Sequence, residues 1–175
     1  KEQFAEAIKE GTVDEMLNKV YVKKGECHFL PAGTAHAVGA GLLIAEIQTP
    51  SDTTYRVFDW NRIDSSGKPR QLHIKEALEC IKFDQDESEL TVNSVGRLVD
   101  SEYFKVDKGH QADNCEVLLR EGEMKILMFL SGKGTIETES AVAVDFKAGD
   151  TVLKPAEYAG VIKFAVDSEY LTIKL

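Results

Sequence analysis

Short runs of β-branched and aromatic residues recur about every 8–12 residues through the C-terminal half of the chain. Gly, Asp or Pro separates each run from the next, and these residue types favour turns. This spacing predicts an all-β sandwich or barrel. The expected strands are 91–98, 102–106, 116–119, 125–130, 134–139, 142–146, 151–154, 161–166 and 170–175.

The N-terminal half mixes helical and strand patterns. Apolar residues at helical spacing predict one helix over residues 1–20, which Gly11 interrupts, and a second over 72–83. A turn is expected at residues 64–69. Short apolar runs cut by Gly and Pro predict strands at 21–22, 27–30, 35–38, 42–48 and 55–60.

One concentrated charge run, DQDESE at residues 84–89, lies between the two halves. It is typical of a solvated linker, although an acidic docking patch or a cation site is an alternative. We therefore place a boundary here and predict two domains, residues 1–90 and 91–175.

An internal repeat relates the two halves. Residues 24–32 (KGECHFLPA) align with residues 148–156 (AGDTVLKPA), so that a glycine–acid turn and a Pro-Ala turn coincide. Extending the alignment places His36 opposite Gly160. If each half holds a β-barrel, the first carries a histidine where the second carries no group that binds metal. The asymmetry predicts one working site and one structural copy.

Composition narrows the choice of partners. The 175 residues include 21 Lys and Arg against 30 Asp and Glu, a net charge of −9. Without a basic field, nucleic acid and anionic membranes are not expected partners, whereas a small phosphorylated substrate remains compatible. No apolar run is long enough for a membrane span, and no leader pattern is present. Three widely spaced cysteines without CxxC predict free thiols in the reducing cytoplasm.

His36 ends a spaced pattern that begins with Gly25 and continues through Pro31 and Gly33. Turn glycines permit a sharp reversal, and the histidine then starts the next strand, from which it can face a barrel mouth. An isolated strand histidine is more often a packing residue, and a catalytic zinc needs three protein ligands. The length of the Gly–Pro pattern favours a ligand.

Three further polar residues follow. Alternation along 42–48 places Glu46 on the same face as Gln48 in an apolar strand, where an acid needs a partner or a ligand. A rim ion pair is the alternative for Glu46, and a turn cap is the alternative for Asp52. Arg56 opens a strand. The residues alone favour a salt bridge to Asp52 or Asp59 over a role in a site.

Four segments carry a family resemblance: PAGTAHAVGAG at 31–41, EIQ at 46–48, SDTTYRVFD at 51–59 and PRQLH at 69–73. They resemble type I mannose-6-phosphate isomerases in their short bacterial form, and the segment from Gly25 to His36 matches the second cupin motif. The resemblance is strong to about residue 83 and weaker beyond it. It implies a mainly β cupin fold (an RmlC-like jelly roll) with tandem β-barrels and a few short helices.

The resemblance also implies roles for the candidate residues. His36 matches a zinc ligand, Arg56 an active-site arginine, and Glu46 and Asp52 carboxylates of the pocket. The first cupin motif with its His-x-His is missing, so the chain resembles the C-terminal part of the enzyme. One Zn²⁺ per full-length subunit is implied, most of its ligands lying upstream. The domain at 1–90 then belongs to the catalytic cupin, and 91–175 is a ligand-free copy.

The implied activity is the interconversion of mannose 6-phosphate and fructose 6-phosphate by the full-length protein, with this chain inactive alone. The expected partner is a sugar phosphate, and the expected assembly is a monomer or homodimer in the cytoplasm. Two alternatives are a non-catalytic sugar-binding or regulatory cupin, and another metal-dependent cupin such as an oxygenase or epimerase. The segment SDTTYR favours the isomerase, because a generic cupin does not need it.

Overall fold

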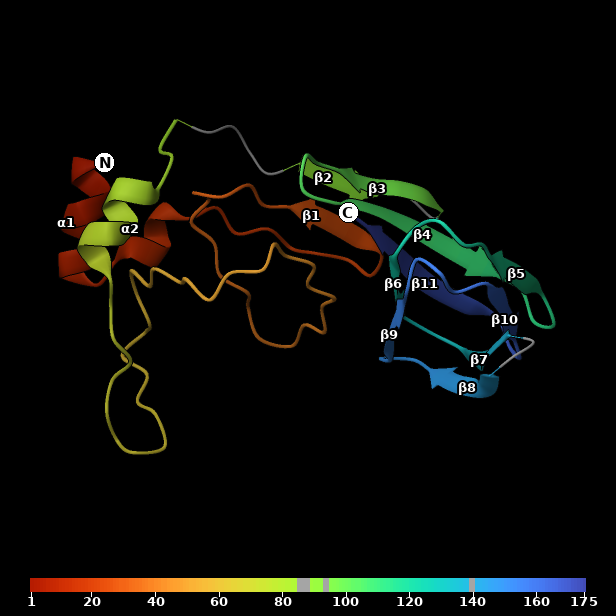
Figure 1. Ribbon diagram of the computed structural model, residues 1–175. Helices are drawn as coiled ribbons and strands as arrows, with labels where there is room; N and C mark the ends of the chain where they lie inside the picture. Colours follow the sequence, from red (N-terminus) through yellow and green to blue (C-terminus); the bar gives the residue numbers. More distant parts are fainter. Residues whose placement is uncertain (85–88, 93–94, 139–140) are drawn as a thin grey trace. The chain divides into compact units, whose positions relative to one another are not determined.

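The computed structural model describes residues 1–84, 89–92, 95–138 and 141–175 (Figure 1). The chain packs as two compact units: unit 1 contains Lys1–Lys23 and Leu30–Glu89, and unit 2 contains Lys24–Phe29 and Leu90–Leu175. The domain assignment at 1–90 and 91–175 stays a prediction. The acidic run at 84–89 lies mostly outside the described residues, so its role also stays a prediction.

The N-terminal helix of unit 1 is interrupted at the expected residue. α1 spans Glu2–Glu10 and the 3-10 helix η1 spans Val13–Met16. Gly11 between them has φ 75°, a left-handed conformation that glycine adopts without steric cost. The second expected helix is α2, Ile74–Cys80. No helix among the described residues is both long and apolar enough to cross a membrane.

The helices of unit 1 surround a small apolar core. Its buried members come from α1 and η1: Phe4, Ala7, Ile8 and Val13. Val57 and Phe58 pack against this core, as does Leu78 of α2. The segment just before residue 59 is therefore fixed by apolar packing on the helices, although it is not part of a sheet.

Four of the strands predicted for the N-terminal half are wrong. Residues 21–22, 35–38, 42–48 and 55–60 have no regular secondary structure. A strand persists only when its amides and carbonyls pair with a neighbour, and no sheet among the described residues includes these segments. Leu43 is fully exposed and Ile44 is half exposed, so the apolar alternation of 42–48 has no core to pack on.

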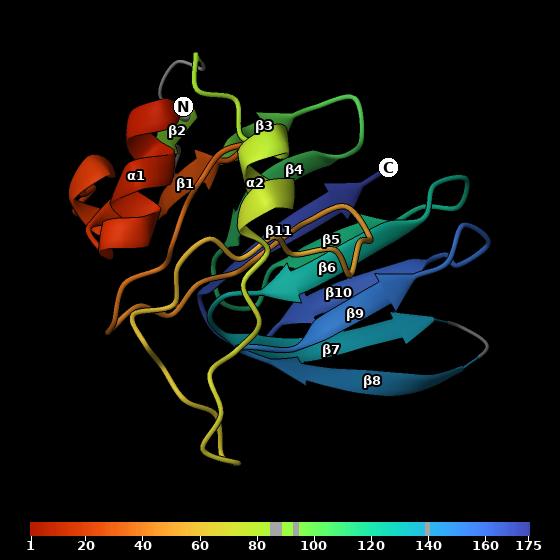
Figure 2. The same cartoon turned by 90° about the vertical axis from the view of Figure 1, so that its left-hand side faces the viewer.

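Unit 2 contains the β structure of the chain. β1 (Glu26–Phe29) pairs with β2 (Glu89–Val92). The other described strands form two antiparallel sheets, with the orders β5-β10-β7-β8 and β3-β4-β11-β6-β9 (Figures 1 and 2). Their bounds are β3 Gly96–Asp100, β4 Lys105–Gln111, β5 Glu116–Leu119, β6 Lys125–Phe129, β7 Lys133–Thr138, β8 Ala141–Lys147, β9 Thr151–Lys154, β10 Gly160–Phe164 and β11 Ser168–Lys174.

An apolar interior joins the two sheets of unit 2. Its buried members come from both sheets: Leu119, Leu127, Phe129, Ile136, Phe146, Ile162, Phe164 and Tyr170. Phe129 stacks on Phe146 with ring centroids 3.7 Å apart, and Phe164 meets Phe146 edge-on at 5.7 Å. The all-β architecture predicted for this half of the chain is therefore confirmed.

The repeat seen in the sequence has a common local structure. Gly25 and Gly149 have φ 93° and 91°, and each stands shortly before a short strand, β1 or β9. After each strand the carbonyl of the proline, Pro31 or Pro155, accepts a hydrogen bond from the amide three residues later, at 3.1 and 3.2 Å. The two segments are thus copies of one turn–strand–turn unit.

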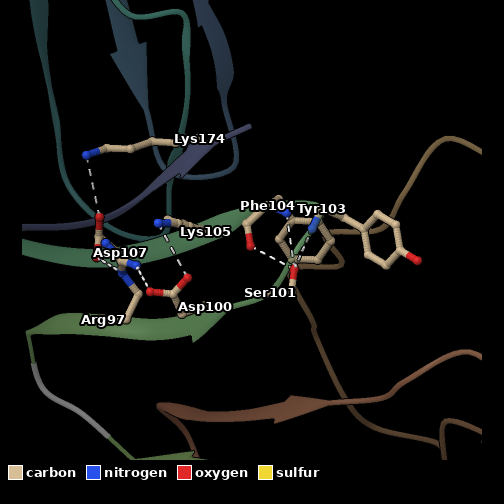
Figure 3. Close-up of polar contacts among 8 residues, drawn as sticks. All are labelled: Arg97, Asp100, Ser101, Tyr103, Phe104, Lys105, Asp107 and Lys174. Atoms are coloured by element: carbon tan, nitrogen blue, oxygen red, sulfur yellow. Dashed lines mark hydrogen bonds and ion pairs between the residues drawn. The ribbon is translucent and has the colours of Figure 1, made fainter.

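Ion pairs between basic and acidic side chains connect the neighbouring strands β3, β4 and β11 (Figure 3). Arg97 donates from Nε to Asp107 Oδ1 and from Nη1 to Asp100 Oδ2, both at 2.6 Å. The ammonium of Lys174 lies 3.8 Å from Asp107, and that of Lys105 lies 3.6 Å from Asp100. Asp107 therefore links cations from the strands on either side of its own.

We expect Asp107→Asn to lower the melting temperature of unit 2 by about 2–4 °C at low salt. The change removes the charge that Arg97 and Lys174 share. Because salt screens partly exposed ion pairs, the difference from wild type should shrink in 1 M NaCl. Asp113→Asn is the matched control, since Asp113 has no ion pair among the described residues. A salt-independent difference would contradict this account.

Candidate functional site

His36 follows the turn at Pro31 in unit 1. Gly33 has φ 94°, and a Cβ there would lie 2.9 Å from the carbonyl oxygen of Cys80, so only glycine fits this approach to the end of α2. The backbone amide of Lys82 donates to Gly33 O at 3.1 Å, which fixes the turn. His36 itself is exposed just beyond this anchored point.

The imidazole of His36 is held through one ring nitrogen. Nδ1 lies 2.9 Å from the carbonyl oxygen of Thr34, so Nδ1 carries the proton and donates it to this acceptor. In the neutral ring, Nε2 is then the nitrogen with the free lone pair. A backbone carbonyl on the opposite ring nitrogen is the usual arrangement of a metal-ligating histidine.

The donor set accommodates only part of a zinc site. His36 fits one ligand position, but no group of three or more His, Cys, Asp or Glu side chains that could hold a metal occurs within the described ranges. A catalytic zinc takes three protein ligands and an open position. The described part of the chain therefore supplies one imidazole and does not complete the site.

Arg56 is half-buried and is framed by the segment before α2. Its backbone carbonyl accepts a hydrogen bond from the amide of His73 at 2.8 Å, and its Nη1 donates to the carbonyl of Gln71 at 3.3 Å. The rings of Tyr55 and His73 lie 6.2 Å apart. Two segments distant in sequence thus run side by side here, and they orient the arginine.

The carboxylate of Asp59 engages Arg70, not Arg56. Arg70 donates from Nε to Asp59 Oδ2 at 2.7 Å and from Nη2 to the other oxygen. Within the described part of the chain, Arg56 has no ion pair with Asp59 or with Asp52. The structural alternative for Arg56, a salt bridge to either acid, is therefore wrong for these residues.

Hydrogen bonding to Arg70 holds the pKa of Asp59 below its ordinary value, and Arg56 and Arg62 add to the effect. A depressed carboxyl pKa contributes stability above the unfolded value of 3.8, which is lost as the pH falls through the folded value. We expect Asp59→Asn to lower the melting temperature of unit 1 at pH 7. The gap from wild type should close as the pH falls below about 3.8, monitored by circular dichroism. A gap independent of pH would contradict the ionic contribution.

Glu46 and Asp52 are exposed, and the described residues provide neither with a hydrogen-bond or ion-pair partner. The rim ion pair considered for Glu46 is therefore not formed with them. At the turn, Ser51 Oγ accepts the amide of Thr53 at 3.2 Å, so Ser51 takes the role considered for Asp52. No hydrogen bond or ion pair among the described residues joins any two of His36, Glu46, Asp52 and Arg56.

The bidentate pair of Asp59 and Arg70 is the feature that sequence reasoning missed. Arg70 was visible in the PRQLH segment and Asp59 in the SDTTYRVFD segment, but nothing in either pattern joins them. Asp59 is a buried polar residue of unit 1, with an exposed fraction of 7%. A buried carboxylate requires a cation or several donors, so an acid next to the apolar pair 57–58 was the available signal.

No family model matches the chain. The sequence is 34% identical over 162 residues to "Mannose-6-phosphate isomerase ManA" of Bacillus subtilis, covering 89% of this chain and 51% of that protein. It is 32% identical over 166 residues to a mannose-6-phosphate isomerase of Streptococcus mutans, covering 89% and 50%. The chain therefore spans about half the length of the curated relatives it matches.

The fold comparison agrees with the sequence comparison. The crystal structure of the mannose 6-phosphate isomerase from Bacillus subtilis matches with a TM-score of 0.57 and 25% identity, over 71% of this chain and 41% of that chain. That isomerase has the cupin fold, and the chain likewise is mainly β with antiparallel sheets. The chain is thus homologous to the mannose-6-phosphate isomerases over about half of their length, and its fold is that of the cupin superfamily.

Proposed function

We propose that this chain is the C-terminal portion of a longer, metal-dependent aldose–ketose isomerase that interconverts mannose 6-phosphate and fructose 6-phosphate. The observation that carries the proposal is 34% identity across 89% of the chain to a mannose-6-phosphate isomerase. Residues 42–48 add support, because their exposed apolar side chains follow a strand pattern without a neighbouring strand in the described structure. In the full-length protein, upstream residues would supply the neighbouring strand.

His36 is the proposed zinc ligand of this chain. The hydrogen bond from Nδ1 to the carbonyl of Thr34 supports the assignment, since it leaves Nε2 to bind the ion. When bound, zinc polarises the carbonyl and hydroxyl oxygens of the sugar. One zinc per full-length subunit is proposed, with the other ligands upstream, so this chain alone would be inactive.

The proton transfer is assigned to a carboxylate. Isomerisation moves a proton from C2 of the open-chain aldose to C1 and a second proton from the C2 hydroxyl to O1, which yields the ketose through an enediol. Glu46 and Asp52 are the proposed candidates, and their carboxylates are exposed and not engaged by other described side chains. Arg56 would offset the developing oxyanion charge or hold the phosphate, because its planar guanidinium donates two bonds and stays charged.

A cytoplasmic protein with a sugar phosphate as its small-molecule partner, monomeric or homodimeric, is proposed. The three cysteines are free in the structure.

An assay of fructose 6-phosphate formation by the full-length protein tests the function. With mannose 6-phosphate and added Zn²⁺, we expect steady turnover. Calorimetric binding of mannose 6-phosphate without turnover would favour the non-catalytic sugar-binding cupin instead. The upstream reading frame is a second check, since the isomerase requires a His-x-His or Gln-x-His pair and a glutamate there.

A further inference from the structure

Three arginines gather around one buried carboxylate in unit 1. Arg70 binds Asp59 in a two-bond fork, while Arg56 and Arg62 lie near enough to lower the pKa of the same group. Arg62 lies over the ring of Trp60, at 5.4 Å from its centroid. The guanidinium of Arg56 has only the carbonyl of Gln71 as a hydrogen-bond acceptor within the described residues.

Asp59 and Arg56 are three residues apart on a segment held by apolar packing, and the charge of Arg56 acts on Asp59, so this carboxylate can compete for Arg56. A carboxylate that bound Arg56 would occupy the donors that an anionic substrate needs. Both oxygens of Asp59 are instead engaged by Arg70. The fork therefore leaves Arg56 without a competing anion.

We propose that Arg70 is a positioning residue: by engaging both oxygens of Asp59, it keeps this carboxylate away from Arg56 and so keeps Arg56 available to the sugar phosphate. The inference rests on the proposed function for the role of Arg56. It adds a residue, Arg70, that touches neither substrate nor metal. The proposal also explains why the acid Asp59 is buried close to Arg56.

The same fork also links two chain segments, 56–59 and 70–73, which together are called the frame below. Asp59 and Arg70 join the two segments at one end, and the hydrogen bond between the His73 amide and the Arg56 carbonyl joins them at the other. A purely structural role for Arg70 would be to hold this frame. The two roles differ in what happens when Asp59 is also neutralised, because the frame is not restored but the competitor is removed.

Steady-state kinetics of the full-length protein separate the two roles. Arg70→Gln should lower kcat/KM for mannose 6-phosphate about tenfold, since Asp59 turns to Arg56. Adding Asp59→Asn should restore kcat/KM to within about twofold of wild type. Arg97→Gln in unit 2, which also removes an arginine that donates to aspartates (Asp107 and Asp100), is the control and should leave kcat/KM unchanged. Equal defects in the single and double variants would overturn the proposal.

A spectroscopic measurement tests, without turnover, whether Asp59 binds Arg56 once Arg70 is removed. The ¹H–¹⁵N signal of the Arg56 guanidinium should shift in Arg70→Gln and return in the double variant; an unshifted signal would overturn the proposal. The double variant leaves no unpaired buried charge, so its fold is expected to survive. An inactive wild-type protein would refute the proposed function, while this signal would still decide whether Arg70 restrains Asp59.

Discussion

Replacing His36 with alanine in the full-length protein is expected to remove its zinc and to abolish isomerase turnover. The ring is exposed, and its Nδ1 is anchored on the carbonyl of Thr34, so Nε2 is presented to a ligand position. Alanine leaves that position empty. Because a bound metal contributes several kcal/mol of charge stabilisation, we expect kcat to fall by roughly 10³-fold or more.

Elemental analysis of the purified variant checks the ligand assignment directly. His110→Ala is the matched control, since His110 is another exposed histidine and its ring contacts Asp167 in unit 2. The control should keep stoichiometric zinc. Stoichiometric zinc retained in His36→Ala would refute the assignment of His36 as a ligand.

Arg56→Ala is expected to lower kcat/KM by about 10²–10³-fold while zinc remains bound. Arg56 is half-buried, and its backbone carbonyl accepts the amide of His73. Its guanidinium donates to the carbonyl of Gln71 and forms no ion pair with a described carboxylate. Removing a preorganised donor costs most when it faces developing charge. Arg120→Ala in unit 2 removes an exposed arginine and should have no effect.

Separate values of kcat and KM locate the action of Arg56. A loss mainly in KM indicates that the arginine holds the phosphate, and a loss mainly in kcat indicates that it stabilises the oxyanion. Unchanged kinetics with full zinc content would assign Arg56 a structural role only.

Most strands of unit 2 could be predicted because turn residues mark their ends, although β4 (Lys105–Gln111) lies mostly beyond the strand expected at 102–106. The runs at 116–119 and 151–154 are β5 and β9 residue for residue, since turn residues bound them and each has a pairing partner within the chain, β10 or β6. The expected strand at 91–98 was too long, as β2 and β3 are separate elements. The turn conformations at Gly25 and Gly149 also followed from the repeat.

The segment that holds the candidate site was harder to predict. Residues 35–60 have strand patterns, but a pattern becomes a strand only beside a partner, and the described structure offers none there. The pairing of Asp59 with Arg70 depends on how a loop folds back, which no periodicity encodes. The site role of Arg56 therefore stays a prediction, and the alternative of a salt bridge from Arg56 to Asp59 is wrong because Asp59 pairs with Arg70.

The steady-state rate of fructose 6-phosphate formation from mannose 6-phosphate, measured with added Zn²⁺ on the full-length protein beside the 175-residue chain, tests the central claim most directly. The account predicts turnover by the full-length protein and none by the chain alone, which supplies one metal ligand. Absence of turnover by the zinc-loaded full-length protein, or turnover by the isolated chain, would contradict it.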